Sequence, residues 1–110
     1  MPFREILQTL VDSRSPAVRA AIFCDHEGER IEASTGDLDA FEVDIAGATF
    51  AAAAQTMSPG HRLRVVVGEE VFWVVTVELG CYLVVWCRIG RDATCLAALP
   101  RVTAALAACM

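Results

Sequence analysis

The sequence predicts a single α+β domain, spanning residues 1–110, whose elements follow the order α-β-β-α-β-β-β-α. A length of 110 residues suits one domain, and 55% hydrophobic against 21% charged residues is the balance of a folded chain. Three segments carry helical periodicity, and the runs between them are rich in Val, Trp, Phe and Tyr, which favour strands. Two of those runs are apolar on both faces instead of alternating, which indicates a sheet covered on both sides.

The first element is a short helix that begins near Pro2. Pro2 suits the first helical position because its missing N–H would have no partner there. Residues 12–16 then predict a break, since Pro16 disfavours the helical conformation at the residue before it. Apolar residues recur on one helical face at Phe3, Ile6, Leu7, Leu10 and Val11.

A β-hairpin follows, formed by residues 18–25 and 30–34. Gly28 lies between the strands and can take the left-handed conformation that a short turn needs. Cys24, Asp25 and His26 stand side by side at this turn. A catalytic pair would need Cys24 and His26 within hydrogen-bond reach and a third group to orient the ring, and the sequence shows no such group. We interpret the three residues as part of a turn and expect no catalytic residue here.

The longest predicted helix covers residues 37–57 and carries two apolar stripes. A helix that lies on its own sheet needs only one stripe. We assign the wider stripe to a partner because its small residues let another backbone come close. The alternative is a monomer in which both stripes of the helix are buried in the core. The narrower stripe consists of Phe41, Ile45, Ala48 and Ala52. The wider stripe consists of Val43, Gly47, Phe50, Ala51, Ala54 and Met57.

Acidic residues cluster at the start of this helix. Their negative charge complements the positive end of the helix dipole, which is the interpretation we favour. The same side chains also form a negative patch that a basic partner could contact. The cluster consists of Asp37, Asp39, Glu42 and Asp44, of which the first three are candidate partner-binding residues.

Three strands and a last helix complete the chain. Arg62 and Arg64 occupy alternate positions at the start of the first of these strands, as is typical near a sheet edge. Asp92 suits the N-cap of the last helix. Pro100 lies inside that helix and predicts either a kink or a restart. The strands are expected at residues 62–68, 71–79 and 82–89.

Composition and motifs argue against several classes of function. A net charge of −5 without any basic cluster argues against nucleic-acid binding. No apolar run is long enough to cross a bilayer, and the first residues show no signal-peptide core, so we expect a cytoplasmic location without membrane insertion. The five cysteines include no Cys-x-x-Cys pair, so we expect no metal site. Without a phosphate loop, a nucleophile elbow or paired carboxylates, we expect no cofactor and no enzyme active site.

The order of elements resembles the Roadblock / dynein-light-chain family, over about residues 3–110. The segments AAIFCDHEGERIEAST and LDAFEVDIAGATFAAAAQ are similar to bacterial Roadblock proteins related to Mgl-type polarity regulators. Pro100 and the Ala-rich central helix depart from the family pattern. The resemblance implies a five-stranded antiparallel sheet with the central helix on one face and the two terminal helices on the other.

The resemblance also implies a homodimer that pairs the third strand and the central helix with their symmetry mates. The family binds Ras-like small GTPases, and its Mgl-type members accelerate GTP hydrolysis without donating an arginine finger. We therefore name no catalytic residue, and we keep Arg14 and Arg91 as exposed partner-binding candidates. The implied dimer interface consists of Val43, Gly47, Phe50, Ala51, Ala54, Arg62, Arg64 and Val66.

The leading hypothesis is a cytoplasmic, homodimeric, non-enzymatic regulator that binds a Ras-like small GTPase. It would modulate GTP hydrolysis as an activator, or as a co-activator beside another Roadblock-type activator. The resemblance suggests bacterial cell polarity or motility as the process, with concentration at a cell pole through partners. The alternatives are a structural adaptor without nucleotide-dependent binding and a small-molecule sensory domain. An enzyme that uses Cys24 ranks last.

Overall fold

A five-stranded antiparallel sheet organises the protein, in the strand order β2-β1-β5-β4-β3. The structure is a computed structural model that describes residues 2–11, 17–57 and 61–110. The predicted order of elements is confirmed, with a short 3₁₀ turn added. The elements are α1 (Pro2–Val11), β1 (Val18–Cys24), β2 (Arg30–Ser34), α2 (Ala40–Ala54), β3 (Arg62–Val67), β4 (Glu70–Val77), η1 (Glu78–Gly80), β5 (Cys81–Arg88) and α3 (Ala93–Ala108).

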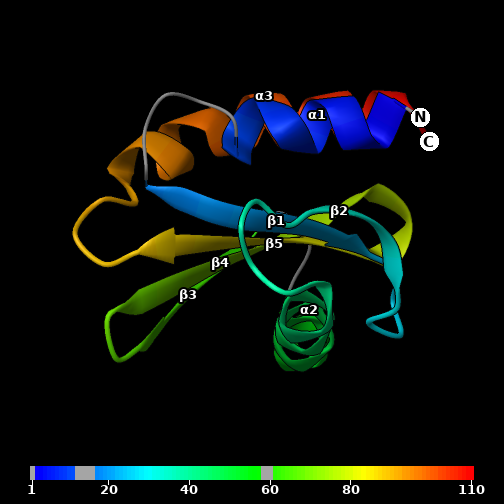
Figure 1. Cartoon of the computed structure of the whole chain (residues 1–110). Coiled ribbons are helices and arrows are strands. Elements are labelled where there is room, and N and C mark those ends of the chain that lie inside the picture. Colours follow the sequence, from blue (N-terminus) through cyan, green and yellow to red (C-terminus); the bar gives the residue numbers. More distant parts are fainter. Residues whose placement is uncertain (1, 12–16, 58–60) are drawn as a thin grey trace.

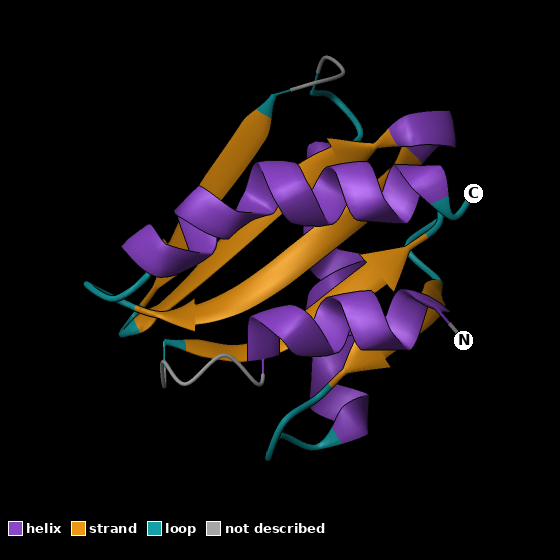
Figure 2. Ribbon diagram, turned by 90° about the horizontal axis from the view of Figure 1, so that it is seen from above, coloured by secondary structure: helices purple, strands orange, loops and turns teal. Residues whose placement is uncertain are grey.

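Helices cover both faces of this sheet. Figure 1 shows α2 alone on one face and α1 with α3 on the other. Seen from above in Figure 2, α1 and α3 lie side by side and run in opposite directions. On that face α1 packs on β1 and β2, while α3 packs on β4 and β5. The predicted three-layer arrangement is confirmed. In the described ranges, no helix combines the length and the apolar character needed to cross a membrane.

Each face of the sheet has its own hydrophobic core. In β5, Leu83 and Val85 belong to the core under α1 and α3, whereas Val84 between them belongs to the core under α2. Because successive side chains of a strand point to opposite faces, both sets are buried and the strand has no polar face. The first core also contains Leu7, Phe23, Leu99 and Leu106, and the second contains Ile22, Val43 and Val74.

The turn between β1 and β2 is built by Asp25. Its carboxylate accepts hydrogen bonds from the backbone N–H groups of Glu27, at 2.9 Å, and Glu29, at 3.0 Å. Gly28 takes the left-handed conformation with φ +86°, and a Cβ there would lie 3.2 Å from the Cα of Ala48 in α2. The turn and its glycine are as predicted, and the Asp25 carboxylate holds the turn in addition.

Helix α2 is shorter than predicted, because Asp39 ends the preceding loop instead of continuing the helix. The Asp39 carboxylate accepts a hydrogen bond from the backbone N–H of Phe41 at 2.7 Å, which is the bond of an N-cap. At the other end, the Gln55 side chain donates to the carbonyl of His26 at 2.9 Å. The break predicted at residues 12–16 and the helix stop predicted at residues 58–60 lie outside the described residues.

Helix α3 continues through Pro100 without the restart that the sequence allowed. Pro100 has no N–H to donate to the carbonyl of Leu96. One turn later, the Thr103 hydroxyl donates to the carbonyl of Leu99 at 2.9 Å and to that of Pro100 at 3.1 Å. Asp92 stands at the N-cap position, and its carbonyl accepts from the N–H of Leu96 at 2.9 Å.

The Asp92 side chain does not cap α3, in contrast to the prediction, because two side chains of the sheet occupy it. Asp92 Oδ2 accepts from Arg64 Nε at 2.9 Å and from Trp73 Nε1 at 2.8 Å. Asp92 is only 8% exposed, so this carboxylate ties β3 and β4 to the start of α3. The Arg64 hydrogen bond, assisted by Trp73, holds the pKa of Asp92 below its usual range, although burial opposes the shift.

Four of the five cysteines are packed inside the protein. Burial raises the pKa of the Cys24 thiol to about 12, and the charge of Asp25 adds to this shift. A thiol of this kind stays protonated at neutral pH and is a poor nucleophile, so Cys24 is a core residue. Within the described residues, no three His, Cys, Asp or Glu side chains are arranged to hold a metal ion. The buried cysteines are Cys24, Cys81, Cys87 and Cys95, and the exposed one is Cys109.

A thiol reagent applied to the folded protein should therefore modify Cys109 quickly and the four other cysteines only after unfolding. Counting the thiols that react with Ellman's reagent, with and without denaturant, measures this directly. The variant Cys109→Ser should lack the fast reaction. Fast modification of Cys24 in the native protein would contradict the packing described above.

The variant Asp92→Asn should lower the free energy of unfolding by about 1–3 kcal/mol at neutral pH, because a charged hydrogen-bond acceptor is lost. The folded protein holds the pKa of Asp92 below the unfolded value of about 3.9, so the carboxylate stabilises the fold above that pH. This contribution disappears as the pH falls through the folded-state pKa. Denaturant titrations from pH 7 to pH 2 should show the two proteins converging at the acid end. The exposed control Glu29→Gln, in the turn between β1 and β2, should change the free energy of unfolding much less than Asp92→Asn.

Candidate protein-interaction surface

The inner side of α2 packs on the chain's own sheet. Val43, Ala51 and Ala54 are fully buried, and Gly47 faces β1. A Cβ on Gly47 would lie 3.1 Å from the Sγ of Cys24 and 3.1 Å from the Cγ2 of Ile22. The assignment of this wider stripe to a partner is thus corrected. Its small residues do allow a close approach, but the side chains that lie against Gly47 are Cys24 and Ile22 of β1 in the same chain.

The outer side of α2 carries the narrower stripe, which was expected to pack on the sheet. Phe41 is 72% exposed and Ile45 is 51% exposed, and Ala48 and Ala52 are exposed as well. We call these four residues the outer stripe. Large apolar side chains at this exposure are unusual on one face of a helix in a monomer, and they mark a surface that another protein can cover.

Two members of the wider stripe lie at the margin between these sides. Phe50 and Met57 are half-buried against the core under α2. The Phe50 ring stacks on the Phe72 ring of β4, with 4.2 Å between the ring centroids. Phe50 therefore anchors α2 to β4, and its contribution to an interface would be limited to its exposed edge.

Strand β3 forms one edge of the sheet, as predicted from its alternating arginines. It hydrogen-bonds to β4 on one side and has no strand on its other side in the described chain. Val66 and Val67 are exposed, at 46% and 55%, while Leu63 and Val65 are half-buried against the core under α2. An apolar edge strand with free backbone groups is a template for pairing with another strand.

The two arginines predicted at the interface have different environments. Arg64 donates to Asp92, so its guanidinium is held by its own chain toward α3. Arg62 is exposed, and among the described residues it has no ion-pair partner. Both side chains belong to the strand face that α3 covers, together with Val66, since alternate residues share one face.

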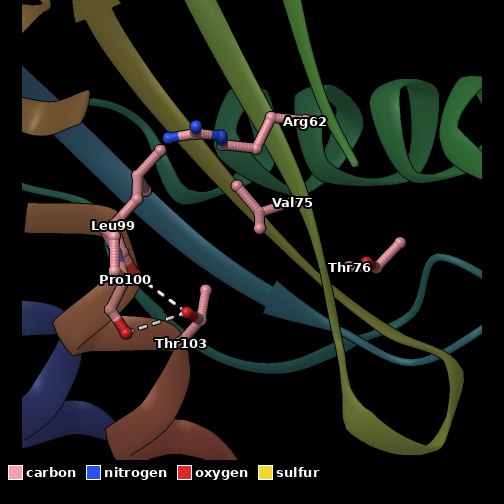
Figure 3. A pocket seen from close by; sticks show the side chains of 6 residues that line it. All are labelled: Arg62, Val75, Thr76, Leu99, Pro100 and Thr103. Carbon is pink, nitrogen blue, oxygen red and sulfur yellow. Dashed lines mark hydrogen bonds between the residues drawn. The ribbon is translucent and has the colours of Figure 1, made fainter. Parts of the chain in front are cut away.

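A shallow cavity of about 250 Å³ lies beside Arg62, between β4 and the Pro100 region of α3. Figure 3 shows Arg62 on one side of it and Leu99, Pro100 and Thr103 on the other. The Thr103 hydroxyl already donates to helix carbonyls. Arg62 is the one charged residue in the lining. A specific small-molecule site requires several convergent polar groups, so this cavity gives the sensor alternative little support.

The predicted partner-binding residues do not form one cluster. Asp37 and Glu42 are exposed at the start of α2, whereas the Asp39 carboxylate is used as the N-cap of that helix. Arg91 is exposed in the turn from β5 to α3, which leads to the opposite face of the sheet. Arg14 lies outside the described residues. The surface with the strongest physical signal is therefore apolar: the outer stripe of α2 and the edge of β3.

Comparisons with known proteins find similarity in structure alone. No family model and no curated protein matches this sequence. Among solved structures, a Roadblock/LC7 domain from Streptomyces avermitilis has a TM-score of 0.76 at 18% identity, covering 93% of this chain and 92% of that chain. MglB from Myxococcus xanthus has a TM-score of 0.77 at 12% identity, covering 96% of this chain and 91% of that chain.

A third structure belongs to the same group. The gliding protein MglB from Thermus thermophilus has a TM-score of 0.75 at 16% identity, covering 96% of this chain and 86% of that chain. The three structures agree with this protein over almost its whole described length, at identities where similarity establishes the fold. The chain therefore has the Roadblock/LC7 fold, as the order of its elements predicts.

Proposed function

We propose that this protein is a Roadblock-type regulator that forms a homodimer and binds a Ras-like small GTPase. The observation that carries the proposal is the uncovered apolar surface on a Roadblock fold, formed by the edge of β3 and the outer stripe of α2. Similar structures include proteins named MglB, one of which is called a gliding protein. The gliding name supports a role in motility. The proposal extends to cell polarity, a cytoplasmic location and recruitment to a cell pole by partners.

The dimer in this proposal is isologous. Strand β3 pairs antiparallel with β3 of a second copy, which satisfies its free backbone groups and covers Val66 and Val67. The contribution of α2 comes from Phe41 and Ile45, in place of the inner residues Val43, Gly47, Ala51 and Ala54, which the chain's own sheet already covers. Arg62 remains at the edge, whereas Arg64 stays bound to Asp92.

The helix surface of this dimer is tested by Ile45→Glu, which places a carboxylate in the outer stripe. Ile45 is already half exposed, so the monomer fold should tolerate the change, and the dimer should weaken about tenfold or more because an unpaired charge would be buried. Sedimentation equilibrium or light scattering measures the mass. The matched control is Ala53→Glu, an exposed position about 80° around the helix from Ile45 and away from Phe41, which should keep the wild-type mass.

An unchanged mass for Ile45→Glu would remove the outer stripe from the dimer interface. A substitution on the inner side of α2 tests the packing of the core and not the dimer interface. Gly47→Glu should unfold the protein, because even a Cβ at that position meets Cys24 and Ile22 at 3.1 Å. A loss of dimer in that variant would report a broken core.

The regulatory role is tested by GTP turnover of the Mgl-type GTPase from the same organism. Turnover is measured for the GTPase alone, with this protein, with that organism's own Roadblock-type activator, and with both. Acceleration by this protein alone identifies an activator, and acceleration only in the combination identifies a co-activator. No acceleration, with equal binding to the GTP-bound and GDP-bound forms or with no binding, would reject regulation and favour the structural adaptor.

A further inference from the structure

The two edge strands of the sheet, β2 and β3, differ in how well they are protected against pairing with another strand. We call an edge closed when its own side chains occupy its backbone groups, and β2 is the closed edge. The backbone N–H of Ala33 in β2 donates to Oε1 of Glu32 at 3.0 Å. The same oxygen accepts from Nη2 of Arg4 in α1 at 3.3 Å. The Ala33 hydrogen bond, followed by that from Arg4, holds the pKa of Glu32 below its usual range, so the side chain is a carboxylate at neutral pH. One donor of this edge strand is thus already occupied.

Further features make β2 a poor template for another strand. Arg30 at its start forms an ion pair with Asp44 of α2, with 3.3 Å between Nε and Oδ1. Ion pairs therefore tie this edge to the helix on each face of the sheet, through Arg4 on one side and Asp44 on the other. Charged edge side chains are a known device that prevents edge-to-edge pairing.

Strand β3 is less protected. Its exposed residues at the far end are the apolar Val66 and Val67, and its one charge without an ion-pair partner in the described ranges, Arg62, lies at its start. The charge in the middle of the strand, Arg64, is drawn toward Asp92 of α3. No carboxylate of the described chain hydrogen-bonds to a backbone N–H of β3. The molecule therefore presents one open edge and one closed edge.

We propose that Glu32, held by Arg4 and by the N–H of Ala33, closes the β2 edge so that the sheet can extend only through β3. This inference rests on the strand pairing of the proposed function. Two copies that pair β3 with β3 form a closed two-fold dimer, whereas pairing of β2 with β3 of the next copy would continue without end. Because the two strands have five and six residues, they match well enough in length for that second mode to be a real competitor.

The test is Glu32→Ala, which removes both the carboxylate on Ala33 and the ion pair with Arg4. The mass of the purified full chain is measured by sedimentation velocity and light scattering over a range of concentrations. The variant should form species beyond the wild-type mass, with a weight-average mass at least about twofold higher at high concentration. The matched control is Glu29→Ala, which removes an exposed acidic side chain from the neighbouring turn and should keep the wild-type mass.

A second substitution separates strand pairing from simple unfolding. Ile31 is an exposed residue of β2, at 42%, and Ile31→Lys adds a charge to the same edge. The double variant Glu32→Ala/Ile31→Lys should return to the wild-type mass. A Glu32→Ala protein that keeps the wild-type mass at every concentration would overturn the proposal. Larger species that persist in the double variant would also overturn it, since they would come from misfolded chains.

These outcomes are independent of the regulatory role. GTP turnover does not enter the measurement, so a failure of GTPase regulation leaves the edge test intact. If the wild-type chain is a monomer, the β3 pairing of the proposed function is wrong. The closing of β2 is then judged by the same comparison: a Glu32→Ala protein heavier than the wild type supports it, and one of equal mass rejects it.

Discussion

The close approach of α2 to β1 at Gly47 is the contact on which the arrangement of the surfaces depends. A Cβ at this position would lie 3.1 Å from the Sγ of Cys24 and the Cγ2 of Ile22, closer than an ordinary van der Waals contact, so a glycine lets the helix lie at this depth without displacing them. With Gly47 directed at the sheet, the helical repeat turns Phe41 and Ile45 toward solvent. A glycine inside a helix costs about 1 kcal/mol relative to alanine, and here the gain is the dense packing of the core under α2.

Much of the fold could be predicted because the relevant signals are local. Periodicity gave the order of the helices and strands, the alternate arginines 62 and 64 marked β3 as an edge, and Asp25 with Gly28 marked the first turn. The two stripes of α2 could not be assigned in this way. Both are apolar, and the choice between them depends on the side chains of β1 that the helix meets. The central glycine was a usable signal, since it indicates the side of closest packing, which in a small domain is its own sheet.

The partners of Asp92 could not be predicted either. Its carboxylate binds Trp73 and Arg64, which precede it by 19 and 28 residues in the chain, and no local pattern encodes such a meeting. Asp92 has a side chain of the type that suits an N-cap, but its carboxylate makes tertiary hydrogen bonds instead. The same reasoning applies to Arg64, whose position at an edge suggested an interface although its charge is satisfied within the chain. In both cases the backbone position was predicted correctly and the side-chain partner was not.

The antiparallel arrangement of α1 and α3 brings the start of one helix beside the end of the other, on the face of the sheet opposite α2 (Figure 2). A fluorescent protein or an affinity tag joined to either end by a short linker would emerge over this helical layer. The outer stripe of α2 would remain accessible to a binding partner in such fusions. Two dyes attached at the two ends would lie close together, and their energy transfer would report whether the two helices stay docked.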